Sequence, residues 1–441
     1  MKYIYGLNKS GKSIIDYLNK INEIYQCWDD DKNIRKNLRK VNNKIIFTNP
    51  LDLNFNLITE SFITPGVSLD DKKISLLNTH KLKLYRDLEL YSRLTKDKKI
   101  IAITGTNGKS TTTKLISDIL NENKIKNFTG GNIGTPLLDF IKKKHKANYH
   151  VIELSSFQLE SFDSFYPYIS ILLNISYDHL DRYNKFEDYK NQKEKIISLN
   201  PKRRNIVCID DEHTYDIYKK YKNNVIPISK SKISNGIYYN DGKIIDNYSK
   251  IRKNIDISNI SMSLFGNFNI ENILAAYVVS NILNIEMDVF QKVIKNFKGL
   301  PHRLENFFFN DTLQVINNSK ATNLEAVIKS ITNYDNINLI LGGRAKEKDF
   351  KKIKQYKDKI NKIYLIGESS TMIFKQLKDD IHCEVCYNLF KAVNKIILDI
   401  KKNYNFQTIL FSPGCASFDQ FKNFEERGDY FKDLMAGIFN E

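Results

Sequence analysis

Short apolar runs alternate with stretches of helical periodicity along most of the chain. This alternation is typical of βαβ units, in which helices connect the strands of a mostly parallel sheet. The sequence therefore predicts a protein of the α/β class. The expected strands are Tyr3–Tyr5, Glu23–Trp28, Lys44–Phe47, Glu60–Ile63, Ile100–Ile103, Tyr149–Leu154, Tyr168–Ile175, Leu313–Ile316, Asn338–Leu341, Lys362–Ile366 and Thr408–Phe411.

Helices are expected where apolar residues recur every three or four positions. A polar helix-like stretch over Tyr85–Arg93, followed by the charged Lys96–Lys99, is interpreted as a linker between domains. The other expected helices are Phe186–Leu199, Asn269–Leu283, Leu324–Thr332 and Leu389–Ile400.

The chain has 441 residues, too many for one ordinary hydrophobic core, and its length suggests about three domains. We predict boundaries that give domains over residues 1–93, 94–298 and 299–441. The first and last show the strand and helix alternation of small Rossmann-like units. The middle one is expected to be built on a mostly parallel sheet.

The net charge and the cysteine content limit the kinds of partner and the cell compartment that we expect. Lys and Arg number 68 against 51 Asp and Glu, and the resulting charge of +17 favours anionic partners. Lysines are spread along the whole chain without an aromatic and basic platform, so nucleic acid is not expected as a partner. Five scattered cysteines and the absence of a leader at Met1 indicate the cytoplasm. No apolar run is long enough to span a membrane. Cys383 and Cys386 lack a second pair, so no metal is inferred from them.

Two segments have the pattern of a phosphate-binding loop. Gly6–Ser13 matches the G-x-x-x-x-G-K-[ST] consensus and follows the first strand. The second strand ends in Asp29–Asp31, where dinucleotide-binding folds place an acid on a ribose. We interpret this loop as the holder of a nucleoside diphosphate, with a helix cap that binds no ligand as the alternative.

The second loop, Thr104–Thr112, lacks the leading glycine because Ile103 stands there. The apolar spacing after Lys109 predicts a helix whose N-terminal amides face a phosphate, with Lys109 as counter-charge. The next expected strand, Tyr149–Leu154, places Glu153 near its carboxyl end, and a carboxylate together with the Ser110 hydroxyl can hold Mg²⁺. This loop is therefore the predicted ATP site.

Two further residues of the middle segment carry candidate chemistry. His179 follows a strand and is a candidate ligand or base, or else a residue that caps a helix. Lys193 lies at helical spacing between apolar residues, so it is predicted to face inward, although a snorkelling side chain has the same spacing. A buried neutral amine could trap CO₂ as a carbamate, which would serve as a carboxylate-like Mg²⁺ ligand.

Eight short motifs follow one another along the chain: Thr104–Thr112, Gly130–Gly134, Glu153–Glu160, Asp178–Tyr183, Gly266–Asn269, Gly299–Arg303, Ser319–Asn323 and Ser412–Phe424. In this order they resemble the Mur ligase family, and in particular its D-glutamate-adding members. The resemblance covers essentially the whole chain.

The resemblance implies an N-terminal domain for a UDP-sugar, a central ATPase domain and a C-terminal domain for the amino acid. It implies that ATP and Mg²⁺ serve to join D-glutamate to UDP-N-acetylmuramoyl-L-alanine through an acyl phosphate, in peptidoglycan precursor synthesis. A cytoplasmic monomer is expected. Other Mur ligases and folylpolyglutamate-type ligases are the alternatives within this class, and a nucleic-acid-dependent ATPase is the alternative outside it.

By resemblance, residues are carried over for each substrate. Ser110 and Glu153 would hold one Mg²⁺, and His179 with carbamylated Lys193 a second one near the acyl acceptor. ATP contacts are expected at Gly105, Thr106, Asn107, Gly108, Lys109, Ser110, Thr111, Thr112, Asn272, Arg303 and Lys320. Contacts to the UDP-sugar acceptor are expected at Ser10, Asp29, Asn132 and His179, and contacts to D-glutamate at Thr322, Lys346, Ser417 and Phe424.

The chain departs from the family pattern at three places. Asn318 stands where the family usually has Asp, and Phe268 replaces a common His. Asp30 and Asp31 replace less acidic residues near the uridine. These changes bear on the nucleotide contacts.

Overall fold

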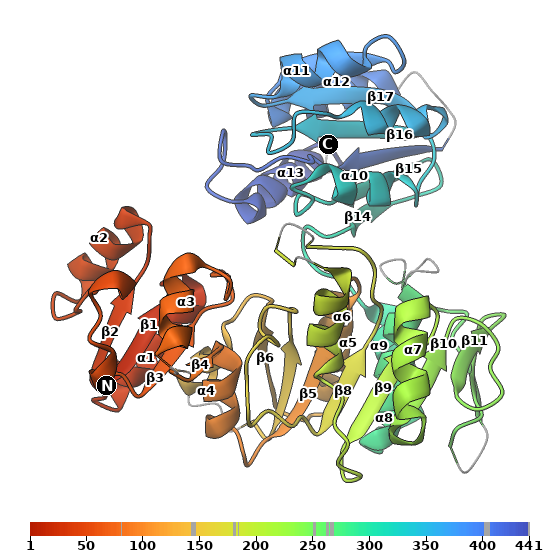
Figure 1. Cartoon of the computed structure of the whole chain (residues 1–441). Helices are drawn as coiled ribbons and strands as arrows, with labels where there is room; N and C mark the ends of the chain where they lie inside the picture. Colours follow the sequence, from red (N-terminus) through yellow and green to blue (C-terminus); the bar gives the residue numbers. More distant parts are fainter. Residues whose placement is uncertain are drawn as a thin grey trace. The chain divides into compact units, whose positions relative to one another are not determined.

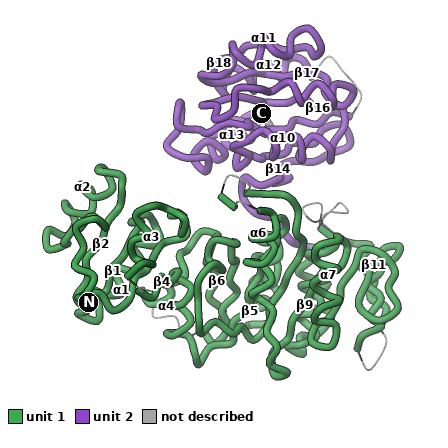
Figure 2. The backbone as a smooth tube through the Cα atoms, viewed as in Figure 1, with its two compact units in different colours: residues 1–260, 267–295 green, residues 261–266, 296–441 purple. Residues whose placement is uncertain are grey.

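The computed structural model describes residues 1–80, 82–142, 147–179, 182–183, 185–249, 253–261, 264, 269–400 and 406–439. The motif residues Leu180–Asp181 and Gly266–Phe268 lie outside the described residues. The chain forms two compact units (Figure 2): residues 1–260 and 267–295 make the first, and residues 261–266 and 296–441 the second.

The first unit begins with a small parallel sheet of order β2-β1-β3-β4 (Figure 1). Its strands are β1 (Lys2–Tyr5), β2 (Tyr25–Trp28), β3 (Glu60–Ile63) and β4 (Leu84–Tyr85). The connecting segments carry α1 (Lys9–Lys20), α2 (Lys32–Val41) and α3 (Lys72–Thr79). The prediction of a strand over Lys44–Phe47 is wrong: Phe47 makes only an isolated parallel bridge to Cys27. Pro50 then starts a short 3-10 helix, so the pairing cannot extend.

A nine-stranded sheet of order β13-β12-β11-β10-β9-β8-β5-β7-β6 forms the rest of the first unit. The strands from β6 to β11 pair in parallel, and β12 and β13 extend the edge as antiparallel strands. The strands are β5 (Lys99–Thr104), β6 (Asn127–Gly131), β7 (Tyr149–Glu153), β8 (Ile169–Leu172), β9 (Arg204–Cys208), β10 (Val225–Ser229), β11 (Ile237–Asn240), β12 (Lys243–Asp246) and β13 (Lys253–Asp256).

The helices of this sheet include the predicted ones. Helix α5 (Lys109–Glu122) packs against β5, β6 and β7 and against α8 (Ile270–Ile282). The others are α6 (Phe186–Glu194), α7 (Glu212–Tyr221) and α9 (Met287–Asn296). Because β5 lies between β7 and β8, the loops after these three strands meet at one edge of the sheet.

The predicted linker is a helix, α4 (Asp87–Leu94), but it is not a solvated connection. Its residues Asp87–Ser92 are buried. Leu88 and Tyr91 belong to one apolar cluster that also holds Ile14 of α1 and Ile152 of β7. The interpretation as a polar linker is therefore wrong, because this shared core joins the two sheets of the first unit.

The second unit is built on a six-stranded sheet of order β14-β15-β19-β16-β17-β18. Only β14 pairs antiparallel among its described strands. The strands are β14 (Glu305–Phe309), β15 (Leu313–Asn317), β16 (Ile337–Gly342), β17 (Ile360–Ile366), β18 (Cys383–Tyr387) and β19 (Gln407–Phe411). The helices are α10 (Leu324–Ile331), α11 (Ser370–Leu377), α12 (Leu389–Ile400) and α13 (Phe424–Phe439).

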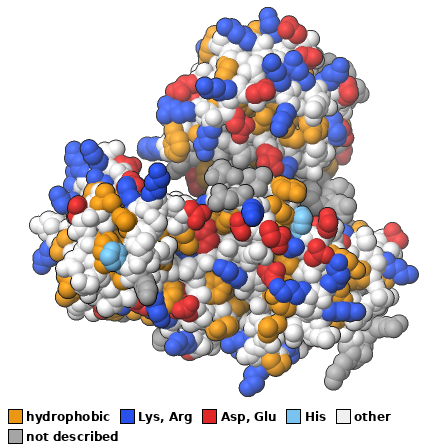
Figure 3. Space-filling model, viewed as in Figure 1, with side chains coloured by type: hydrophobic (Ala, Val, Ile, Leu, Met, Phe, Trp, Pro, Cys, Tyr) orange, Lys and Arg blue, Asp and Glu red, His pale blue; other side chains and the backbone are white. Residues whose placement is uncertain are grey.

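The predicted class is confirmed: all three sheets are mostly parallel and are covered by helices. Within the described part of the chain, no helix has the length and apolar character needed to cross a membrane. Basic side chains on the face seen in Figure 3 are interspersed with acidic ones over both units.

Candidate active site

The loop Gly105–Gly108 leads from β5 into α5 and has the geometry of a phosphate cradle. Gly108 caps the helix at φ +79°, in the left-handed region that favours glycine. A Cβ at Gly108 would lie 2.3 Å from Oδ1 of Asn272. A larger residue at this position would therefore collide with Asn272, and the N-terminus of α5 follows directly after this glycine.

Ser110 and Glu153 are in direct contact. The Ser110 hydroxyl in the first turn of α5 donates to Oε2 of Glu153 at 2.6 Å, and both side chains are buried. The Asn132 side chain, after β6, donates to the other carboxylate oxygen at 2.9 Å. A hydroxyl and a carboxylate are hard oxygen donors, and Mg²⁺ usually takes one or two such protein ligands together with phosphate oxygens and water. The donor set at Ser110 and Glu153 fits that ion.

Lys193 is buried at 1% relative exposure, as its helical spacing predicted. Its Nζ donates to the Gly105 carbonyl oxygen at 2.7 Å and lies 4.8 Å from the centre of the Tyr189 ring. Burial lowers the pKa of Lys193 well below its usual value, and the positive charge of Lys109 lowers it further, against the opposing effect of Asp178 and Glu153. This environment favours the neutral amine.

Lys109 folds back over its own loop. Its Nζ donates to the carbonyl oxygens of Gly105 and Thr106, each at 2.8 Å. Thr106 is fixed in turn by Tyr189, since their hydroxyl oxygens lie 2.9 Å apart. Lys109 and Lys193 thus meet at the phosphate loop from two different helices.

His179 lies on the loop after β8, close to this cluster. Its φ of +54° is uncommon for a residue with a side chain, and such conformations are frequent at functional sites. The imidazole packs 4.7 Å from the Phe157 ring and 6.2 Å from the Tyr189 ring, centre to centre. Its side chain is 43% exposed and so is accessible to a ligand.

Asn272, on α8, closes the other side of the loop. Its Oδ1 accepts from the Thr112 hydroxyl at 2.9 Å, and its amide donates to Asn269 at 2.8 Å. Asn174, after β8, accepts from the backbone N–H of Asn107 at 2.8 Å and donates to Glu271 at 2.6 Å. Asparagine side chains from two segments, the loop after β8 and helix α8, therefore hold the predicted ATP loop in place. Thr111, another predicted ATP contact, lies in the first turn of α5.

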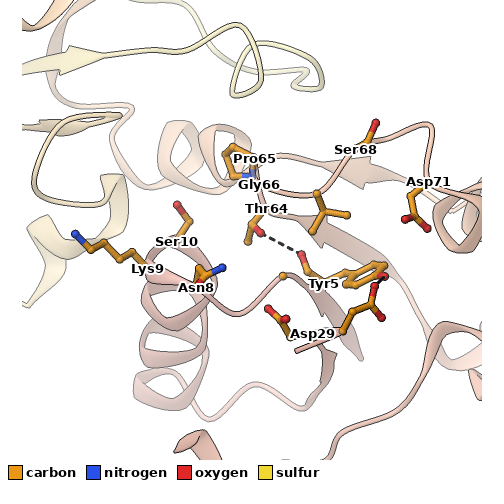
Figure 4. Close-up of a pocket in the computed structure, with 13 residues that line it drawn as sticks. Tyr5, Asn8, Lys9, Ser10, Asp29, Thr64, Pro65, Gly66, Ser68 and Asp71 are labelled. Atoms are coloured by element: carbon orange, nitrogen blue, oxygen red, sulfur yellow. Dashed lines mark hydrogen bonds between the residues drawn. The ribbon is translucent and has the colours of Figure 1, made fainter. Parts of the chain in front are cut away.

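A separate cavity of about 650 Å³ lies beside the first loop (Figure 4). This size is within the usual range of small-molecule sites. Its wall comes from the start of α1, from the end of β2 and from the turn after β3. The lining residues are Tyr5, Gly6, Asn8, Lys9, Ser10, Asp29, Asp30, Thr64, Pro65, Gly66, Val67, Ser68 and Asp71.

The carboxylates of Asp29 and Asp30 in this cavity each accept several hydrogen bonds. Asp29 is buried and accepts from the backbone N–H groups of Leu7 at 2.6 Å and Asp31 at 2.9 Å. Burial by itself would raise the pKa of Asp30, but hydrogen bonds from Lys73, Tyr5 and Trp28 outweigh burial and lower it. Asp29 therefore shapes the loop as well as lining the cavity.

The remaining predicted residues belong to the second unit. Ser417 is buried, Thr322, Arg303 and Phe424 are partly exposed, and Lys320 and Lys346 are exposed. Their segments follow the carboxyl ends of β15, β16 and β19, except Arg303, which precedes β14, and Phe424, which begins α13. Asn318, the departure from Asp, donates to the Ser412 hydroxyl at 3.2 Å and accepts from the Leu304 N–H at 3.2 Å. The neutral amide thus donates to one partner and accepts from the other, whereas an ionised carboxylate could only accept, and the Ser412 hydroxyl would then have to be the donor.

Sequence reasoning missed several residues of the site. Asn174 was visible as a polar residue at a strand end, but nothing in its spacing showed that it binds the phosphate loop. Glu271 carries no local signal, because its partner Asn174 is distant in sequence. Among the described residues, no group of three or more His, Cys, Asp or Glu is arranged as a metal centre.

Comparison with known proteins gives three kinds of match. Residues 103–280 match the family model of the Mur ligase middle domain. The UDP-N-acetylmuramoylalanine–D-glutamate ligase of Rickettsia bellii is 36% identical over 436 residues, covering 97% of this chain and 95% of that protein. The enzyme of the same name from Wolbachia pipientis is 32% identical, covering 99% and 96%.

Solved structures share the fold. The UDP-N-acetylmuramate-alanine ligase MurC of Thermotoga maritima superposes with a TM-score of 0.58 at 17% identity, covering 99% of each chain. The MurF ligase of Thermotoga maritima, solved in complex with ADP, has a TM-score of 0.54 at 15% identity, covering 88% of this chain and 97% of that one.

Proposed function

The chain belongs to the Mur ligase family, among the UDP-N-acetylmuramoylalanine–D-glutamate ligases, and we propose that it joins D-glutamate to UDP-N-acetylmuramoyl-L-alanine at the expense of ATP. The product is a peptidoglycan precursor. The observation that carries the assignment of the ATP site is the Ser110–Glu153 hydrogen bond, next to Lys109 at the N-terminus of α5. It places a hydroxyl, a carboxylate and an ammonium group together where a triphosphate would be held.

The reaction has two steps. An oxygen of the alanyl carboxylate attacks the γ-phosphorus of ATP, the bond to the β-phosphate breaks, and ADP and an acyl phosphate form. The amine of D-glutamate then attacks the acyl carbon, loses a proton, and the tetrahedral intermediate expels inorganic phosphate. Both steps bring anions together, so neutralisation and positioning supply most of the catalysis.

This chain's residues would perform the neutralisation. Lys109 and the amides of Gly105–Gly108 would bind the phosphates, and Ser110 and Glu153 would hold Mg²⁺, which supplies positive charge to the triphosphate. Thr111, Thr112 and Asn272 would complete the nucleotide contacts. We assign His179 and carbamylated Lys193 to a second Mg²⁺ near the acyl acceptor.

Burial supports the carbamate assignment. Its formation joins the neutral Lys193 nitrogen to the carbon of CO₂ and releases one proton. The low pKa of Lys193 keeps the amine in the reactive neutral form. The carboxylate-like product would convert a buried amine into an oxygen donor for Mg²⁺.

The acceptor and D-glutamate would bind outside the phosphate loop, with their reacting ends directed toward it. We assign the uridine diphosphate of the acceptor to the cavity of Ser10 and Asp29, with Asn132 and His179 nearer its reacting end. Thr322, Lys346, Ser417 and Phe424 would bind D-glutamate, and Arg303 and Lys320 would contact ATP. We also keep the three-domain division at residues 93 and 298, and a cytoplasmic monomer, as proposals.

A phosphate-release panel tests the substrate assignment. The protein is given ATP and Mg²⁺ with UDP-N-acetylmuramoyl-L-alanine or UDP-N-acetylmuramate, each crossed with D-Glu, L-Glu, L-Ala and a diamino acid. Release is expected only with UDP-N-acetylmuramoyl-L-alanine and D-Glu. Release with a different pair, and none with this one, would refute the proposal.

A further inference from the structure

Two arginines lie behind the turn that lines the UDP cavity. Arg86 Nη1 donates to the carbonyl oxygens of Ile63, Thr64 and Val67, at 2.9, 2.7 and 3.0 Å. Arg182 Nη1 donates to the Pro65 carbonyl at 2.6 Å, and its Nη2 to that of Val67 at 3.0 Å. The turn after β3 is thus fixed through its own carbonyl oxygens.

Glu160 joins the two guanidinium groups. Its Oε2 accepts from Arg86 and, at 3.1 Å, from Arg182, and its Oε1 accepts from the Tyr183 hydroxyl at 2.9 Å. The side chains of Arg86, Glu160 and Arg182 are 0%, 9% and 12% exposed. Buried charge-assisted hydrogen bonds of this kind hold a defined geometry.

Arg182 also contacts the surroundings of His179, on the loop after β8. Its Cζ lies 3.9 Å from the centre of the Phe157 ring, on which His179 packs at 4.7 Å. In addition, the backbone N–H groups of Arg182 and Tyr183 donate to the His179 carbonyl at 3.0 and 3.1 Å. One side chain therefore contacts the turn of the UDP cavity and the ring that supports His179.

We infer that Arg182 is a positioning residue that relays occupancy of the UDP cavity to His179. A ligand that moves the Pro65–Val67 turn moves the two carbonyl oxygens bound to Arg182. The guanidinium group then shifts on Phe157, and the imidazole of His179 follows. This inference rests on the proposed function, since it takes the cavity as the uridine site and His179 as a residue of the catalytic site.

The test uses UDP alone as the probe. UDP would occupy the cavity of Ser10 and Asp29, but it lacks the part of the acceptor that reacts. The protein is labelled at its histidines, and the His179 imidazole signal is assigned by its loss in His179→Ala. Calorimetry measures UDP binding separately. Saturating UDP is expected to shift the His179 signal in the wild type and to leave it in place in Arg182→Met.

The control is Lys195→Met. Lys195 donates to the backbone carbonyl of Glu160 at 2.8 Å, so its loss removes a neighbouring cation without breaking the link from Pro65 to Phe157. The UDP response of His179 is expected to persist in this variant. Should Arg182→Met not fold, Arg182→Lys keeps the charge but loses the planar fork, and a reduced response is expected there.

The outcomes separate the two proposals. Bound UDP that leaves the wild-type His179 signal unchanged, or an equal response in wild type and Arg182→Met, overturns the relay. No UDP binding in the wild type instead refutes the assignment of the cavity and the relay that rests on it, whereas the proposed function is decided separately by the phosphate-release panel. In turnover, Arg182→Met is expected to raise KM for the acceptor and lower kcat about tenfold, with KM for ATP unchanged.

Discussion

Lys109 and Lys193 donate hydrogen bonds to the same acceptor, the carbonyl oxygen of Gly105, at 2.8 and 2.7 Å. One ammonium group comes from the start of α5 and the other from α6. Two full positive charges on one carbonyl would repel each other strongly, so a neutral Lys193 relieves the repulsion. The same neutral amine is the species that reacts with CO₂.

Replacing Lys193 tests this chemistry. Lys193→Ala removes the amine and is expected to lower kcat at least about 100-fold, as for other losses around a metal site. Formate or acetate at high concentration should partly restore turnover, because a free carboxylate can enter the space left by the carbamate. Wild-type activity in the same salts is the control. Absence of any rescue would contradict the carbamate.

The two phosphate loops are distinguished by a matched pair of lysine variants. Lys109→Ala should abolish phosphate release, since it removes the ammonium group from the predicted ATP loop. Lys12→Ala is expected at most to raise KM for the acceptor, because Lys12 is exposed and is absent from the lining of the cavity of Ser10 and Asp29. Steady-state kinetics with each substrate varied in turn measures both. The opposite pattern would exchange the two sites.

The fold followed from the sequence where apolar runs are continuous. Strand β8 (Ile169–Leu172) is buried throughout and lies within the apolar run Tyr168–Ile175 that was predicted as a strand. The helix predicted over Phe186–Leu199 ends at Glu194, but its inward-facing Lys193 was correctly identified. The strand predicted over Lys44–Phe47 was wrong because an apolar run does not show how far the pairing extends: Phe47 bridges Cys27 of the edge strand β2, and the chain then turns into the 3-10 helix at Pro50.

Polar contacts between distant segments were the part that could not be predicted. Arg86 and Glu160 are 74 positions apart and bind each other only after two sheets have packed on a common core. No local spacing encodes such a pair. The Ser110–Glu153 contact is the exception: Ser110 follows β5 and Glu153 ends β7, and the carboxyl ends of adjacent parallel strands lie together.

Ser110 should set the Mg²⁺ requirement. Ser110→Ala leaves Glu153 in place but removes the hydroxyl donor, so the Mg²⁺ concentration for half-maximal turnover is expected to rise about tenfold. Ser117→Ala is the control: Ser117 is also buried on α5, but it bonds to Asn127 and Thr129 instead. Titration of activity with Mg²⁺ at saturating ATP measures the effect. An unchanged Mg²⁺ curve in Ser110→Ala would show that this hydroxyl is not a ligand.

Glu271 makes stability depend on pH. Burial raises its pKa from 4.5 to about 7, with Asp210 acting in the same direction and Lys230, Cys208 and Asn174 opposing it. The folded protein therefore holds this proton over a pH range in which the unfolded chain has lost it. The resulting stability is fully present below about pH 4.5 and is lost as the pH rises through about 7.

Glu271→Gln should reverse this loss, because the neutral amide keeps an oxygen for the Asn174 amide and carries no charge to bury. The variant is expected to match the wild type near pH 4.5 and to exceed it above pH 7, by up to about 3 kcal/mol for a shift of this size. Thermal unfolding of both proteins across this range measures the difference. Glu122→Gln, at a more exposed ion pair with Lys292, should leave the pH profile nearly unchanged. A difference between Glu271→Gln and wild type that stays constant with pH would show that Glu271 is ionised in the folded protein at neutral pH.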